Sequence, residues 1–123
     1  MAEQSECCVG APKLIFPCSG AADVGAIADQ AGRKMTRDGA GKMYCLAGIG
    51  GRVSGIVEST KAAAQILAID GCAVNCAKAT LEQAGFTRFE HLRLADMGFE
   101  KGKSPVTDEA VARVAVQGAQ LLK

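Results

Sequence analysis

Short apolar runs alternate with segments of helical periodicity along the chain, and this alternation constrains the fold more than any other feature. The apolar runs lie at residues 13–17, 42–47, 65–69 and 89–94. The helical segments that follow them lie at residues 24–35, 53–63, 72–84 and 107–118. A strand followed by a helix, repeated four times, predicts a parallel sheet joined by right-handed crossovers. We expect an α/β fold, a single three-layer, Rossmann-like domain whose four-stranded, mainly parallel sheet carries helices on both faces.

The third apolar run supports a sheet that is covered on both sides. It does not alternate between apolar and polar residues, and it carries β-branched side chains at Ile66 and Ile69, as do strands with two buried faces. The chain of 123 residues fits one domain with its own core. We expect a flexible N-terminal arm over residues 1–12 and a single α/β domain over residues 13–123.

Composition gives no support to two classes of partner. The net charge is +1, and one Tyr, four Phe and no Trp leave few rings on which bases could stack, so we expect no nucleic acid. No apolar run approaches the roughly 20 residues of a membrane helix, and the acidic, polar residues 1–6 are unlike a secretory signal. We expect a cytoplasmic protein without a membrane partner, and the sequence identifies no protein partner.

The six cysteines are the main functional feature. In a reducing compartment they favour metal ligation or redox chemistry over structural disulfides, although some cysteines are simply small buried hydrophobes. Cys18, Cys45 and Cys72 each follow an apolar run, and ligands of open parallel sheets bind beyond the carboxyl ends of the strands. Cys76 lies one helical turn after Cys72, so both sulfurs can face one object.

A plausible strand order lets these thiols share one metal ion. If the first strand lies between the second and the third, in the order 2-1-3-4, the outer two of these strands are roughly 9.6 Å apart, twice the strand spacing. A zinc ion at about 2.3 Å from each sulfur just spans that gap. Four thiolates are the preference of zinc, with iron as an alternative. The metal hypothesis is therefore one Zn²⁺ held by Cys18, Cys45, Cys72 and Cys76.

A thiol redox protein or thiol enzyme is the alternative hypothesis, and whether the chain is an enzyme stays open. A helix that begins near Cys72 would favour its thiolate, which makes Cys72 the candidate nucleophile. Cys76, or the adjacent pair Cys7 and Cys8, would then resolve the intermediate in sulfur, selenium or metalloid chemistry. We expect Asp70 to cap that helix. A third hypothesis is an interaction module in which the metal only stabilises the fold.

Three short motifs carry a resemblance to a known family. They are Pro17-Cys18-Ser19-Gly20, Cys45-Leu46-Ala47 with Gly50-Gly51, and Asp70-Gly71-Cys72 with Cys76-Ala77. The chain resembles the DGC-domain proteins, small prokaryotic proteins named for the Asp-Gly-Cys triplet, over nearly everything from Lys13 onward. Members of that family are regarded as candidate zinc-binding proteins. The resemblance implies that Cys18, Cys45, Cys72 and Cys76 are the four ligands and that residues 13–123 form a DGC-type domain.

Other residues have weaker functional signals. His91, the only histidine, is expected to be structural or solvent-facing. The segment Gly48-Ile49-Gly50-Gly51 lacks the Lys-Ser/Thr ending of a phosphate-binding P-loop, so we expect it to leave backbone room beside the sulfurs, with Arg52 offsetting their charge. Ser19 lacks an Asp–His pair in the sequence around it, which argues against serine catalysis.

Overall fold

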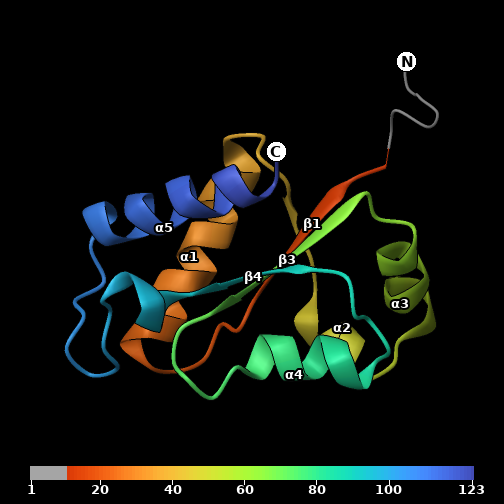
Figure 1. Cartoon of the computed structure of the whole chain (residues 1–123), viewed down its shortest axis with the longest axis horizontal. Helices are drawn as coiled ribbons and strands as arrows, with labels where there is room; N and C mark the ends of the chain where they lie inside the picture. Colours follow the sequence, from red (N-terminus) through yellow and green to blue (C-terminus); the bar gives the residue numbers. More distant parts are fainter. Residues whose placement is uncertain (1–10) are drawn as a thin grey trace.

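The computed structural model describes residues 11–123, and these residues form one open sheet with helices packed on both sides (Figure 1). The elements, in chain order, are β1 (Lys13–Pro17), α1 (Asp23–Arg37), β2 (Lys42–Met43), α2 (Leu46–Gly50), α3 (Ser54–Lys61), β3 (Gln65–Asp70), α4 (Cys76–Gln83), β4 (Glu90–Arg93), the 3₁₀ helix η2 (Leu94–Met97) and α5 (Asp108–Leu121). The predicted arm falls almost wholly on residues 1–10, outside the described residues, and so do Cys7 and Cys8.

The four strands are all parallel and lie in the order β2-β1-β3-β4. This order confirms the predicted α/β class and the predicted placement of the first strand between the second and the third. Successive side chains of a strand point to opposite faces of the sheet. The carboxyl ends of the four strands lie along one edge of the sheet, because all four strands run in the same direction.

Two buried clusters of apolar side chains cover the two faces of the sheet. Ile15 of β1 and Leu67 of β3 pack with α1 and α5, whereas Phe16 and Ala68, one position further along each strand, pack with α2 and α4. All four of these strand residues are fully buried. The absence of alternation in the third apolar run therefore has the expected cause, a strand with two covered faces.

Two element boundaries differ from the sequence-based predictions. The second strand ends at Met43 instead of residue 47, because the chain turns into the short helix α2, for which Cys45 is the N-cap. The helix predicted over residues 72–84 begins only at Cys76. The preceding residues form a turn that ends at Asn75, whose backbone is left-handed with φ of 60°.

No helix within residues 11–123 is both long enough and apolar enough to cross a membrane.

The segment between η2 and α5 is held to the start of α1 by one carboxylate. Asp23 accepts hydrogen bonds from the backbone N–H groups of Gly102 (2.9 Å) and Ser104 (3.0 Å), and also from that of Val24 (2.8 Å). The amides of Gly102 and Ser104 are the main reason that the pKa of Asp23 lies below its usual range.

A carboxyl group whose pKa is lower in the folded state than in the unfolded state stabilises the folded protein at pH values above the unfolded-state pKa. This contribution is lost as the pH falls through the folded pKa. We expect the amide resonances of Gly102 and Ser104 to titrate together, with a midpoint below about 4, the usual range of aspartate. Measuring their chemical shifts by NMR against pH tests this, and Asp23→Asn should abolish the joint titration. A midpoint at or above the usual range would contradict the expectation.

Candidate thiol site at the strand ends

The four cysteines of the described chain lie at the carboxyl edge of the sheet. Cys18 follows β1 directly, Cys45 lies two residues after β2, and Cys72 lies two residues after β3. Cys76 is the first residue of α4. All four thiols are free. Cys18 and Cys72 are half-buried, whereas Cys45 and Cys76 are exposed. The prediction that the strand ends carry the thiols therefore agrees with the topology.

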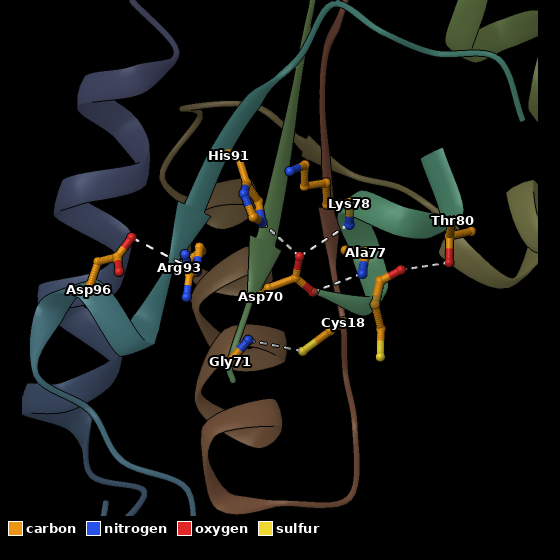
Figure 2. Close-up of polar contacts among 10 residues, drawn as sticks. Cys18, Asp70, Gly71, Ala77, Lys78, Thr80, His91, Arg93 and Asp96 are labelled. Atoms are coloured by element: carbon orange, nitrogen blue, oxygen red, sulfur yellow. Dashed lines mark hydrogen bonds and ion pairs between the residues drawn. The ribbon is translucent and has the colours of Figure 1, made fainter. Parts of the chain in front are cut away.

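Backbone amides fix the direction of two sulfurs. The Sγ of Cys18 accepts a hydrogen bond of 3.4 Å from the N–H of Gly71, so the turn after β3 closes over the end of β1 (Figure 2). The Sγ of Cys45 accepts a hydrogen bond of 3.3 Å from the N–H of Gly48 and thereby caps α2. Each thiol is held by an element other than its own strand.

Cys18 and Cys45 line one hollow of about 540 Å³ between the ends of β1 and β2. Cys72 and Cys76 do not line it. Within the described part of the chain, no three side chains among histidine, cysteine, aspartate and glutamate are grouped closely enough to hold a metal ion. The donor chemistry of four thiols fits zinc. The side-chain positions bring two of the thiols to one hollow, and a shared site for all four stays a prediction.

The carboxylate of Asp70 organises the turn that carries Cys72 and Cys76. Its side chain is only 1% exposed. It accepts hydrogen bonds from the backbone N–H groups of Ala77 (2.8 Å) and Lys78 (3.1 Å) at the start of α4 (Figure 2). The expectation that Asp70 caps the following helix is confirmed.

The position of that cap overturns one premise about Cys72. Because α4 begins at Cys76, its first amide groups do not surround Cys72, and two of them are occupied by Asp70. The argument that a helix start favours the Cys72 thiolate is therefore wrong. The sequence pattern missed the turn because Ala73 and Ala77 also fit a continuous helix.

His91 has a structural role that agrees with one of its two expected roles, although the sequence analysis did not name its partner. Its Nε2 lies 2.8 Å from the second carboxylate oxygen of Asp70, and its side chain is 18% exposed. In the register of β3 and β4, Ala68 pairs with His91 and Asp70 pairs with Arg93. The side chains at positions 70 and 91 therefore point to the same face of the sheet. The alternation of side chains along the two strands was the one sequence feature that could have indicated their contact.

A second carboxylate, Asp29 of α1, borders the hollow. It accepts hydrogen bonds from the Nε of Arg33 (2.7 Å) and from the hydroxyl of Ser19 (2.8 Å). Burial raises the pKa of Asp29, but these two hydrogen bonds and the charge of Arg33 outweigh burial and place the pKa below its usual range. Asp29 thus ties the turn after Cys18 to α1.

The glycine-containing segment before Arg52 differs from the expected open loop. Gly48 lies in α2, and a Cβ there would meet the side chain of Ile56 at 2.8 Å. Arg52 donates hydrogen bonds to the carbonyl oxygens of Ile49 and Gln83, each at 2.8 Å. Its guanidinium joins α2 to α4 instead of offsetting charge on the sulfurs.

Comparisons with known proteins agree on one family. The family model described as the DGC domain matches residues 14–117. The chain is also 33% identical, over 88 residues, to a protein of Pseudomonas aeruginosa named "Anaerobic and virulence modulator AnvM". That alignment covers 72% of this chain and 67% of the relative. No solved structure matches the chain.

Proposed function

The chain belongs to the DGC-domain family, and from this premise we propose that it is a metal-binding protein. It holds one zinc ion, or a similar soft metal, through Cys18, Cys45, Cys72 and Cys76. Membership of the family supports a metal-binding role. The observation that supports the finer proposal is the position of four free thiols, which follow three neighbouring strands, along one edge of the sheet.

The middle of the turn after β3, at Ala73 and Val74, is the part with room to adjust, whereas its two ends are anchored by Gly71 and by the start of α4. Ala73 and Val74 are exposed, Val74 at 70%. The N–H of Asn75 donates to the carbonyl of Cys72 over 3.4 Å, which is long for an N–H···O hydrogen bond. A rearrangement confined to this turn changes where Cys72 points and leaves β3 and α4 in place.

The donor set decides what kind of metal site this is. A zinc ion with four protein thiolates has no open position for a substrate, so the site is structural or sequestering and not catalytic. Zinc supplies no redox chemistry of its own, and in the zinc-bound form the four thiols contribute metal binding alone. The proposal includes a cytoplasmic location, because free thiols persist in a reducing compartment.

Metal content tests the proposal directly. Protein purified without oxygen is expected to carry about one zinc per chain by elemental analysis, and Cys72→Ala and Cys76→Ala are each expected to lose it. A Cys7→Ala/Cys8→Ala variant is the matched control, since it removes two thiols outside the proposed set and should keep the metal. A wild-type protein that folds normally but carries no metal would contradict the proposal.

A second candidate function is a thiol redox protein that uses Cys72 and Cys76 for sulfur, selenium or metalloid chemistry. It is favoured by the free state of both thiols and by their position on either side of one short turn. The alkylation rate of Cys72 in metal-free protein separates the two candidates. Fast alkylation of Cys72, compared with the exposed Cys45, favours redox chemistry, and slow alkylation excludes Cys72 as a nucleophile.

A further inference from the structure

The hollow over Cys18 and Cys45 adjoins a second one along α1. The second hollow measures about 590 Å³ and extends to Thr36 and Arg37. Arg33, Tyr44 and Cys45 border both hollows. Cys45, the exposed thiol of the pair, therefore stands at the junction of two concave surfaces, with Cys18 inside the first.

Positive charge dominates these surfaces. Arg33 donates its Nε to Asp29, and neither of its terminal nitrogens donates a hydrogen bond to another residue among those described. Its side chain is 61% exposed. Arg37 forms no ion pair within residues 11–123. Two guanidinium groups and one carboxylate, that of Asp29, therefore border the two hollows. Asp29 binds the Nε of Arg33, and within residues 11–123 the two terminal nitrogens of Arg33 stay available.

The two thiols follow neighbouring strands and border one hollow. Ile15 of β1 pairs with Met43 of β2, and the N–H of Tyr44 donates to the carbonyl of Ile15 at 2.8 Å. Cys18 and Cys45 follow these neighbouring strands. Continued for two residues, this register places Cys45 beside Pro17, the residue before Cys18. Both thiols border the same hollow, and a bond between them requires the Sγ of Cys18 to turn from the N–H of Gly71 toward Cys45.

We propose that Cys45 and Cys18 form a dithiol that reduces a small disulfide bearing a negatively charged group, which Arg33 binds. A guanidinium fork suits a carboxylate, with which it forms paired hydrogen bonds. This activity goes beyond metal binding and belongs to the metal-free protein, because Cys18 and Cys45 are two of the four proposed zinc ligands. It uses a different pair of thiols from the redox candidate above.

The reaction balances with the small disulfide as the oxidant. The thiolate of Cys45 attacks one sulfur of the disulfide, the S–S bond breaks, and a mixed disulfide forms on Cys45 while the first small thiolate leaves. The thiolate of Cys18 then attacks the Cys45 sulfur, which forms the protein disulfide and releases the second small thiolate. Each released thiolate takes a proton from water. Two protein thiols are oxidised, and one small disulfide is reduced to two thiols.

Two disulfide probes of different charge test the role of Arg33. Reduced, metal-free protein is mixed with oxidised glutathione, which is anionic, or with bis(2-hydroxyethyl) disulfide, which is neutral. Arg33→Gln is expected to slow the reaction with oxidised glutathione about tenfold, in line with charge focusing in a cleft, and added salt should slow the wild type toward the variant. The neutral probe should react with both proteins at the same rate. Arg88→Gln is the matched control, because it removes an exposed arginine that lines neither hollow.

Mass spectrometry of the products tests the assignment of the thiols. Wild-type protein should end with Cys18 joined to Cys45, and Cys18→Ser should accumulate glutathione on Cys45. Equal slowing of both probes by Arg33→Gln, no slowing of either, or an adduct on Cys72 or Cys76 would overturn the proposal. The zinc content of protein from the same preparation, measured before the metal is removed, distinguishes failure of this proposal from failure of the zinc proposal. A protein that binds zinc but does not reduce the disulfide probes as described would overturn only the present proposal.

Discussion

Replacing Asp70 with alanine is expected to lower the free energy of unfolding by about 2–4 kcal/mol. This range combines the loss of a helix cap with the exposure of buried donors that lose their partner. The variant leaves the N–H groups of Ala77 and Lys78 without an acceptor and His91 without its carboxylate. Urea denaturation followed by circular dichroism measures the change.

Two further variants make the Asp70 result specific. Asp70→Asn keeps an oxygen that can accept from one of the two amides, so it should lose less stability than Asp70→Ala. Asp96→Ala is the control, because Asp96 is 68% exposed and its only ion pair with a described residue, Arg93, spans 3.9 Å. If Asp70→Ala costs no more than Asp96→Ala, the capping role is wrong.

Replacing Gly71 with alanine is the second large expected effect. A Cβ at this position would lie 2.8 Å from the backbone carbon and oxygen of Val24 and 2.9 Å from its side chain. A backbone neighbour cannot rotate away, so β3 and α1 have to separate. We expect the free energy of unfolding to fall by about 1–3 kcal/mol, the usual cost of overpacking.

A glycine with open surroundings provides the matched control for Gly71. Gly55 lies in α3, and a Cβ there would meet no atom within 4 Å. Gly55→Ala should raise the free energy of unfolding by up to about 1 kcal/mol, because alanine favours the helix. The two variants should therefore shift the urea midpoint in opposite directions. A neutral or stabilising Gly71→Ala would show that α1 and β3 are not in the described contact.

These two predictions assign a structural task to the Asp-Gly-Cys triplet. Asp70 holds the start of α4, Gly71 lets the chain pass against α1, and Cys72 packs half-buried against the core. The turn that presents Cys72 and Cys76 is thus anchored on both sides of the sheet. A variant at Asp70 or Gly71 is expected to displace Cys72 and Cys76 without removing either of these proposed ligands.

The sheet could be predicted because its signals are local. Each apolar run is bounded by turn residues, and the alternation of strand and helix leaves few arrangements of parallel strands. The fourth strand, expected over residues 89–94, is β4 (Glu90–Arg93). The order β2-β1-β3-β4 was introduced as a supposition, and it agrees with the structure.

Contacts between residues distant in the sequence decide two features that the sequence did not reveal, the start of α4 and the partner of His91. The start of α4 is decided by Asp70, seven positions before Ala77, and by the left-handed backbone of Asn75. The pairing of Asp70 with His91 joins positions 21 residues apart on neighbouring strands. Periodicity within one segment carries no information about either contact. The thiols could be assigned to one edge, but their side-chain directions depend on such turns.

The central place of β1 sets the order in which the thiol edge is completed during synthesis. Every residue that lines the hollow over Cys18 and Cys45, except Thr80, precedes β3 in the chain. The two strands that flank this hollow, β1 and β2, pair directly with each other. Cys18 and Cys45 therefore leave the ribosome before Cys72 and Cys76. The edge that carries these four thiols is complete only when β3 pairs with the other side of β1.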